Sequence, residues 1–378
     1  MGTLKKIRSR IPWGLVFNIF IVGFTIFLIV FFIFSKDGFI DLLNSGVKIN
    51  VLWLLFAVFM HLSNIAIDAT IIYLFVKEST PDFSLKNAIV VSMVGQFYCA
   101  ITPSASGGQP MQILSMTRMG VSGANGTAAL IQKFLVWQFT LTAYSVFAMV
   151  AKFSMFVGSL DYAMWVLTAI GFTGQILTIV VLLLASFNKS FTSKLIGGIF
   201  RFLGKIHLMK NVDQRIVNLN KTLNSFHECN KTLNKNKALV VKVYVLTFIQ
   251  LTILFLVPFC IAMSFGVGEK NGNVNMLDML CAQSYVSMVS GLVPLPGGSG
   301  AAEYCFSQFF GSFFDAQMIK SAILIWRTIT YYGTIMVSLP FAAVRKKKNA
   351  APIDDSADNN DNNDNNNSNN DNGLAETE

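Results

Sequence analysis

The stretch GQFYCAITPSASGGQP, residues 95–110, interrupts a long apolar segment with proline, serine and glycine. Proline and paired glycines disfavour the interior of an α-helix, so an apolar helix cannot continue unchanged through this stretch. A second interruption, SGLVPLPGGSGAAE at residues 290–303, divides another apolar segment in the same way. The positions of these two breaks decide which fold the sequence predicts.

Composition identifies the class of protein in which such breaks occur. The chain has 378 residues, of which 53% are hydrophobic and 13% are charged, whereas soluble domains carry about 25% charged residues. Five cysteines form no CxxC pair, and the three histidines show no metal-binding spacing. We therefore predict an integral membrane protein with no disulfide framework, no metal and no cofactor.

Six apolar segments are long enough to cross a hydrocarbon core of roughly 30 Å as helices. They are residues 14–34, 51–76, 124–150, 162–187, 239–264 and 317–344. Two further apolar segments, 85–119 and 276–313, contain the breaks, and neither half of either segment is long enough to cross. The sequence therefore predicts an all-α polytopic membrane protein with six full spans and two re-entrant hairpins of half-helices.

The distribution of basic residues orients these segments. The N-terminus, the loop 188–238 with its ten Lys and Arg residues, and the RKKK stretch at 345–348 are all basic, so the positive-inside rule places them in the cytoplasm. All three basic segments can be cytoplasmic only if each hairpin returns to the side of the membrane from which it entered. The order span, span, hairpin, span then occurs twice with opposite orientation, at about 10–150 and about 160–345. Such inverted repeats are typical of transporters that bind substrate at the midplane between broken helices.

Two segments lie outside the predicted spans: the loop 188–238 within the membrane domain, residues 1–345, and the tail that follows this domain. The loop 188–238 has apolar residues at helical spacing and basic residues between them. It can lie on the anionic inner leaflet or form a short cytoplasmic helical hairpin, and both interpretations stay open. Residues 346–378 are rich in Asn and Asp, and we expect a disordered cytoplasmic tail. Removing its eight acidic residues would raise the net charge from +9 to +17.

The breaks and the charged residues at membrane depth supply the candidate site. A break aims the N-terminus of the following half-helix at the midplane, where unsatisfied N–H groups and the helix dipole favour an anion. We expect no catalytic residues, and we expect a lipid headgroup to bind at these positions. They are Thr102, Pro103, Ser106, Gly107, Gly108, Gln109, Lys133, Pro296, Gly297, Gly298, Gly300, Glu303 and Arg327.

The intramembrane charges also allow a purely structural interpretation. Lys133 can pair with Asp68, and Arg327 can pair with Glu303, because a buried ion pair can serve only to hold helices together. In a mixed interpretation, Arg327 binds a phosphate and Glu303 orients it. Three weaker candidates, more typical of packing, an interface anchor or a hairpin start, are His61, Trp137 and Asp278.

The two break motifs are similar to motifs of a known protein family. ITPSASGGQP followed by MQILSMTRMGVS, together with PLPGGSGAAE about 190 residues later, resembles the lysylphosphatidylglycerol synthase transmembrane-region family. This family is also called the flippase-like domain family and forms the membrane part of the multiple peptide resistance factor. The likeness covers roughly residues 10–345. It implies a bacterial inner-membrane protein concerned with phospholipids, in which a membrane domain moves aminoacylated phosphatidylglycerol and a separate domain makes that lipid from aminoacyl-tRNA.

The resemblance and the residues together give three hypotheses. Only 33 residues follow Arg345, so we expect the synthase domain to be absent and the chain to be a translocase of an anionic or aminoacylated phospholipid. The alternatives are a phosphatidylglycerol lysyltransferase and a non-transporting subunit that recruits a soluble synthase. Expected partners are membrane phospholipids and, through loop 188–238, the inner leaflet, with no specific nucleic acid. Both termini should be cytoplasmic, and an oligomer is compatible with the sequence.

Overall fold

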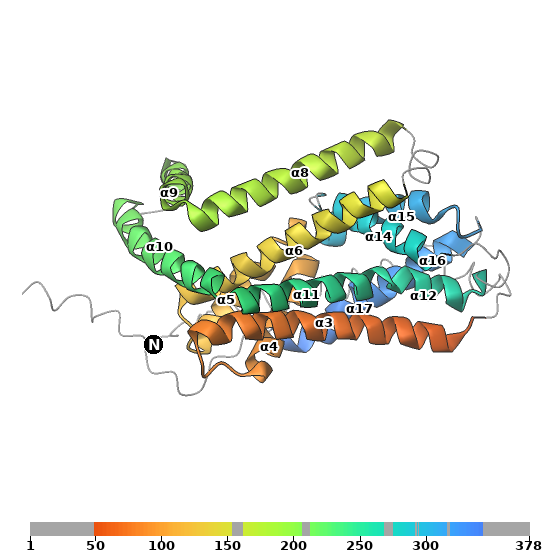
Figure 1. Cartoon of the computed structure of the whole chain (residues 1–378), viewed down its shortest axis with the longest axis horizontal. Helices are drawn as coiled ribbons and strands as arrows, with labels where there is room; N and C mark the ends of the chain where they lie inside the picture. Colours follow the sequence, from red (N-terminus) through yellow and green to blue (C-terminus); the bar gives the residue numbers. More distant parts are fainter. Residues whose placement is uncertain are drawn as a thin grey trace, which may run out of the picture.

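The computed structural model describes residues 49–152, 162–205, 212–267, 275–291, 293, 295–315 and 318–342. Regular structure in these ranges is entirely helical (Figure 1). Five described helices are long and apolar enough to cross a membrane, namely Val51–Ser79, Gly123–Ala151, Trp165–Phe187, Lys237–Ser264 and Met318–Phe341. The predicted fold class, an all-α polytopic membrane protein, is confirmed. The predicted first span, 14–34, and the tail, 346–378, lie outside the described residues.

The spanning helices begin at residues that cap them. In α3 (Val51–Ser79) the Asn50 side chain accepts a hydrogen bond from the Leu52 amide. In α6 (Gly123–Ala151) the Ser122 hydroxyl accepts one from the Asn125 amide at 3.1 Å. Such caps satisfy N–H groups that have no partner within the helix. The span α8 (Tyr162–Phe187) follows α6.

Two spans that the sequence predicts as continuous helices are interrupted. The fifth consists of α11 (Lys237–Phe255) and α12 (Val257–Ser264), and Pro258 lies just after the junction, where its missing N–H removes a helical hydrogen bond. The last consists of α16 (Met318–Arg327), a π-helical turn over Thr328–Tyr332, α17 (Gly333–Ser338) and a final turn at Leu339–Phe341. π-Helical turns are frequent at functional sites and shift the register of the side chains that follow.

The two broken segments form hairpins, as the sequence predicts. The first contains α4 (Leu85–Ile101), a short turn at Pro103–Ala105 and α5 (Gly108–Arg118). The second contains α14 (Met276–Ser290), a turn at Pro296–Gly298 and α15 (Ala301–Phe310). Within each hairpin the two helices pack together, and the two turns contact each other. Figure 1 shows α5 near one end of the bundle and α15 near the other, so the hairpins enter from opposite ends and meet inside.

The two turns share a backbone conformation. After Pro103, Ser104 and Ala105 have φ of 50° and 54°; after Pro296, Gly297 and Gly298 have φ of 61° and 62°. The hydrogen bonds also correspond, since the Ser106 amide donates to the Pro103 carbonyl and the Ser299 amide donates to the Pro296 carbonyl. This match supports the predicted inverted repeat more strongly than sequence identity does. The repeat boundaries, 10–150 and 160–345, stay a prediction.

The loop 188–238 contains α9 (Lys189–Lys205) and α10 (Val212–Lys235). α10 packs against α6 and α9. Its Leu223 is buried, and its Phe226 and Leu233 are buried in a core shared with α3 and α6. The sequence left two interpretations of this loop open, and the burial of Phe226 and Leu233 is what a cytoplasmic helical hairpin would show. Contact of the loop with the inner leaflet stays a prediction. Packing against a protein surface produces the same apolar spacing as contact with lipid, so periodicity could not separate the two.

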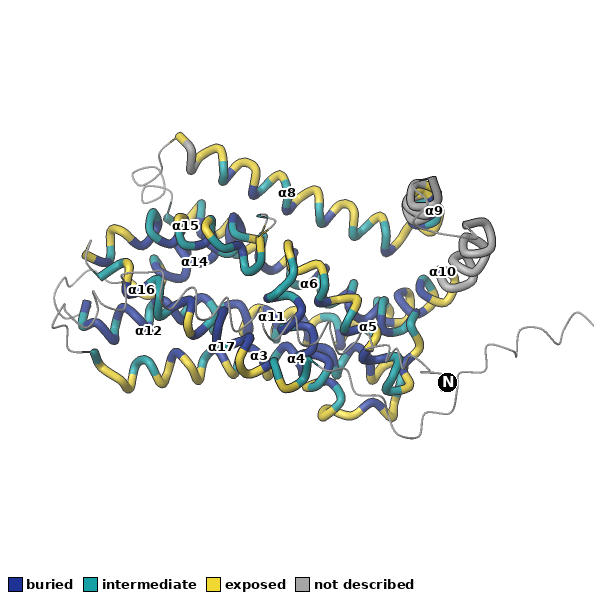
Figure 2. The backbone as a smooth tube through the Cα atoms, turned by 180° about the vertical axis from the view of Figure 1, so that it is seen from behind, coloured by how far each residue is buried: buried dark blue, intermediate teal, exposed yellow. Residues whose placement is uncertain are grey.

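The outer surface of the bundle is apolar. Figure 2 shows α8 with exposed positions along much of its length, and its exposed side chains include Ile176 and Leu177, which are 56% and 61% exposed. Inside the bundle, an aromatic cluster packs the second hairpin against the last span: Phe306 stacks on Phe310 and on Trp326. Apolar surface outside and polar surface inside is the arrangement that a bilayer favours.

Candidate functional site

A cavity of about 650 Å³ lies where the two break turns meet. Its walls come from α3, the first hairpin, α6, α11, the second turn and the last span. Its polar lining residues include His61, Asn64, Asp68, Ser106, Gln109, Gln112, Lys133, Gln250, Thr330 and Thr334. This volume falls within the usual range for small-molecule sites, about 300–1,000 Å³.

A polar stripe on α3 forms one wall. His61, Asn64 and Asp68 are spaced by three and four residues, which places them on one face of the helix. Each is buried, with 6%, 6% and 4% of its surface exposed. Polar groups are costly inside a membrane protein unless they have partners or serve a site. All three residues line the cavity. A role in this cavity explains why an otherwise apolar span contains three polar side chains.

The charge at the centre of the cavity is a buried ion pair. Lys133 Nζ lies 2.6 Å from Asp68 Oδ1, and the other carboxylate oxygen accepts a hydrogen bond from the Ser92 hydroxyl at 2.6 Å. The side chains of Lys133 and Asp68 are only 17% and 6% exposed. The structural pairing that the sequence left open is present, and the same two residues also line the cavity. Pairing and ligand binding are therefore compatible at this position.

The first break is strained where it faces the cavity. Ser104 and Ala105 line the cavity with positive φ, a conformation that residues with a side chain rarely adopt. Thr102 holds the turn closed, because its hydroxyl donates to the Tyr98 carbonyl at 2.5 Å and accepts from the Gly107 amide at 2.9 Å. The strain and the cap together fix the start of α5. Ser106, just before this helix, and Gln109, in its first turn, both line the cavity.

Arg327 holds the second break. Its Nε lies 3.1 Å from Glu303 Oε1, and its Nη1 donates to the Gly297 carbonyl at 2.9 Å. Glu303 in turn accepts a hydrogen bond from the Gly300 amide at 2.6 Å. Arg327 does not line the cavity. The geometry thus favours the pairing interpretation for this arginine, and headgroup binding by Arg327 stays a prediction.

The last span connects the two breaks through its π-helical turn. Tyr331 donates from its hydroxyl to the Ala100 carbonyl, at the end of α4, at 3.0 Å. Its ring covers Gly297, where any added Cβ would overlap it. Arg327, one turn earlier, bonds the same Gly297. The last span therefore fixes the position of the first break relative to the second.

The predicted site residues separate into groups. Ser106, Gln109, Lys133 and Gly297 line the cavity. The others shape the breaks. Pro103 and Pro296 begin the turns, Thr102 and Gly107 form the hydrogen bond that closes the first turn, and Gly108 and Gly298 are buried. Gly300, Glu303 and Arg327 are joined by a hydrogen bond and an ion pair beside the second turn. A Cβ at Gly298 would lie 2.7 Å from the Ser290 carbonyl oxygen. Close packing within the hairpin thus already accounts for this glycine.

Sequence reasoning missed several cavity residues. Asn64, Gln112 and Gln250 were not singled out, and His61 and Trp137 were treated as packing, yet all five line the cavity. The available signal was the spacing of polar residues on α3. Gln112 had no such signal, because it depends on Gly95 of the neighbouring helix leaving room for its amide.

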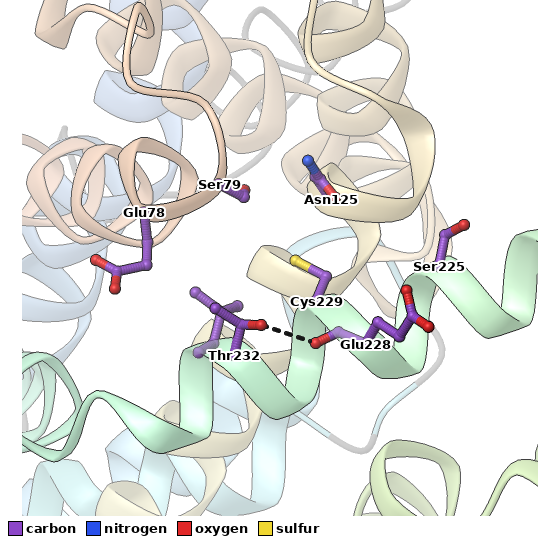
Figure 3. A pocket seen from close by; sticks show the side chains of 8 residues that line it. Glu78, Ser79, Asn125, Ser225, Glu228, Cys229 and Thr232 are labelled. Atoms are coloured by element: carbon purple, nitrogen blue, oxygen red, sulfur yellow. Dashed lines mark hydrogen bonds between the residues drawn. The ribbon is translucent and has the colours of Figure 1, made fainter.

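A second, smaller pocket lies between α3, α6 and α10 (Figure 3), with a volume of about 250 Å³. Glu78, Asn125 and Glu228 are among its lining residues, and it contains no residue of the predicted site. The Thr232 hydroxyl donates to the Glu228 carbonyl of the same helix at 3.1 Å. Burial raises the pKa of the neighbouring Cys229 thiol, which keeps it protonated and unreactive. This pocket offers no chemistry comparable with the central cavity.

Comparison with known protein families gives a match that spans both hairpins and the cavity. The family model described as the lysylphosphatidylglycerol synthase TM region matches residues 15–338, which include both hairpins and every residue of the cavity. The chain belongs to this family.

Two relatives of this family member have names that state no activity. A "UPF0104 membrane protein" of Archaeoglobus fulgidus is 25% identical over 277 residues, covering 70% of this chain and 78% of the relative. An "Uncharacterized protein MG306 homolog" of Mycoplasma pneumoniae is 21% identical over 356 residues, covering 86% of each. No solved structure matches the chain.

Replacing Arg327 and Glu303 together tests whether this pair only holds the break. In Arg327→Gln/Glu303→Gln the buried charges disappear together, so we expect a loss of about 1–2 kcal/mol from the Gly297 and Gly300 hydrogen bonds. Arg327→Gln alone leaves Glu303 buried without its cation and should cost more. Unfolding of the purified protein in mixed micelles compares the single and the double variant, and a double variant less stable than Arg327→Gln alone would contradict the pairing interpretation.

Proposed function

We propose that the protein moves phospholipids between the leaflets of a membrane, with the headgroup passing through the central cavity. The single observation that carries this proposal is the position of the cavity. It lies where two re-entrant hairpins from opposite ends of the bundle meet, and it contains the Lys133–Asp68 pair. Transporters with broken helices bind substrate at such a midplane position.

The chemistry of the cavity suits a headgroup. A phospholipid headgroup crossing the hydrocarbon core loses its hydration, and that loss is costly unless protein groups replace the water. Lys133, Ser106 and Gln109 supply donors for a phosphate, and Asp68 and Asn64 supply acceptors. The acyl chains can stay in the bilayer against the apolar exterior. The proposed substrate class is the one that the family name suggests, an anionic or aminoacylated phospholipid.

The alternatives have less support. A lysyltransferase that uses aminoacyl-tRNA would need to admit an RNA acceptor stem, and a cavity of about 650 Å³ among membrane helices is too small for one. A non-transporting subunit that recruits a synthase would use the surface of α9 and α10. That hypothesis gives no reason for a buried ion pair and a polar stripe in the interior, which the transport hypothesis explains.

We also propose an orientation and a location. The proposed membrane is the bacterial inner membrane, with α9 and α10 at its cytoplasmic side, because their segment carries ten Lys and Arg residues. The basic helix α9 is then the part of loop 188–238 placed to contact the anionic leaflet. Both termini would share that side, consistent with the basic N-terminus and the basic stretch 345–348.

Reconstitution tests the proposal directly. Vesicles containing the purified protein should move acyl-labelled phospholipid from the inner to the outer leaflet faster than protein-free vesicles, as measured by the fraction of label reached by a membrane-impermeant quencher. The control variant is Lys152→Met, which removes a second lysine–aspartate pair, Lys152 with Asp278 at 2.7 Å. This pair does not line the cavity, so its loss should leave the rate unchanged. Wild-type vesicles with the rate of empty vesicles would contradict the proposed function.

A further inference from the structure

Three residues that line the cavity have buried hydrogen-bonding atoms that no described residue satisfies. Asn64 Oδ1, Gln250 Oε1 and His61 Nδ1 are buried and have no hydrogen-bond partner. Gln250 Nε2 donates to the Asn64 carbonyl at 3.3 Å, so the unsatisfied oxygen of Gln250 points away from that bond. His61 uses its other nitrogen for the Thr334 hydroxyl at 2.8 Å. Buried polar atoms without partners destabilise a protein, and each one in a native structure requires an explanation.

These acceptors lie beside the negative half of the ion pair. Asn64 is one helical turn before Asp68 on the same face of α3, and Gln250 is bonded to the backbone of Asn64. Gln250 is 1% exposed, and Asn64 is 6% exposed. Two residues with unsatisfied amide oxygens and a carboxylate thus lie next to one another among the residues that line the cavity. Such a set requires a ligand group with several N–H or O–H donors.

The charges restrict the ligand further. Among the described lining residues, Asp68 and Lys133 carry the formal charges, and they neutralise each other. A ligand that brings only a phosphate would take Lys133 and leave Asp68 buried with the Ser92 hydroxyl as its remaining partner. A buried charge that loses its partner is strongly unfavourable. A ligand with both a phosphate and a cation replaces both partners and leaves no buried charge unpaired.

We propose that the cavity takes a zwitterionic phospholipid headgroup. Its phosphate pairs with Lys133, and its N–H-bearing ammonium pairs with Asp68 and with the side-chain oxygens of Asn64 and Gln250. The ligand is thus itself an ion pair that splits the Lys133–Asp68 pair and substitutes for it. This inference rests on the proposed function for the identity of the site, and it changes the substrate class by excluding purely anionic headgroups in favour of those with zero net charge and an ammonium donor.

Three lipids separate the charge requirement from the donor requirement. Dioleoyl phosphatidylethanolamine is zwitterionic with N–H donors, dioleoyl phosphatidylcholine is zwitterionic without them, and dioleoyl phosphatidylglycerol is anionic with hydroxyl donors. Native mass spectrometry of the full chain in detergent measures binding of each. Wild-type protein should bind phosphatidylethanolamine at least about tenfold more tightly than either of the others, because hydrogen bonds to charged groups are worth about that factor. Equal binding of the three lipids, or a preference for phosphatidylglycerol, would overturn the inference.

Variants locate the preference in the cavity. Asn64→Leu and Gln250→Met should each reduce phosphatidylethanolamine binding by about tenfold and leave phosphatidylcholine binding unchanged. The control is Gln132→Met, another buried amide, which bonds Asn230 outside the cavity; it should keep the preference. Folded Asn64 and Gln250 variants that retain the full preference would contradict the assignment. If these variants do not fold, the comparison of three lipids on wild-type protein decides the question.

A parallel vesicle assay distinguishes this inference from the proposed function. Selective binding of phosphatidylethanolamine without movement between leaflets would contradict the transport function and support the headgroup assignment. Equal binding and equal movement of all three lipids would support transport and contradict the zwitterionic site. A preference for phosphatidylethanolamine in both binding and movement would support the transport function and the zwitterionic site together.

Discussion

Gly297→Ala is expected to lower the free energy of unfolding by about 2–5 kcal/mol. Gly297 has φ of 61°, and a Cβ at this position would overlap the ring of Tyr331. The substitution therefore adds the cost of a left-handed conformation to the cost of moving a ring that bonds the first break through Ala100. Unfolding of the purified protein in mixed micelles measures the change.

Gly300→Ala is the matched control for this prediction. Gly300 also has positive φ, 87°, but a Cβ there would meet no atom within 4 Å. Its substitution should cost only the backbone component, about 1–2 kcal/mol. Tyr331→Ala removes the ring that the added Cβ would meet. The stability lost through Gly297→Ala should therefore be smaller in a Tyr331→Ala background than in the wild-type protein. Equal losses in the two glycine variants would show that the ring does not pack on the second break.

Lys133→Met is expected to destabilise the protein by about 3–5 kcal/mol, because it leaves the Asp68 carboxylate buried without its cation. Asp68 is 4% exposed and keeps only the Ser92 hydroxyl as a described side-chain partner. In Asp68→Asn/Lys133→Met neither charge remains, so most of the lost stability should return. The same unfolding measurement in mixed micelles compares the single and the double variant.

Lys152→Met serves as the control for this pair. Lys152 and Asp278 also form a close ion pair, but their side chains are 27% and 19% exposed. The Asp278 carboxylate raises the pKa of Lys152 through a hydrogen bond and its charge, and water can replace that interaction when the lysine is removed. Stability should therefore change little. A single Lys133→Met variant as stable as Lys152→Met would show that the central pair is not buried as described.

The sequence allowed the hairpins to be predicted because their signal is local. The clustered prolines and glycines within 102–110 and 295–301 disfavour a helix through the local sequence alone, and the lengths of the remaining halves follow directly. The distortions within two spans were not predicted. Pro258 was a visible signal, but the π-helical turn at Thr328–Tyr332 has no such local signal. It lies where Arg327 and Tyr331 bond segments far away in the sequence.

The candidate site could be predicted only in part for a related reason. Lys133 was found because a charge in an apolar span is conspicuous in any context. Asn64 and Gln250 are neutral, and their importance depends on two helices meeting at one cavity, which no local pattern states. Gly298 was assigned to headgroup contact, yet the Ser290 carbonyl already accounts for it. Sequence shows where glycine is required, but not which atom requires it.

The transport rate of Asp68→Asn/Lys133→Met in reconstituted vesicles tests the central claim most directly. Removing both charges keeps the fold and deletes both groups that are proposed to hold the headgroup. The account predicts a stable, membrane-inserted double variant whose lipid movement equals that of protein-free vesicles, alongside Lys152→Met at the wild-type rate. A stable double variant that moves lipid as fast as wild type would show that the pair only joins α3 to α6, and it would contradict the account.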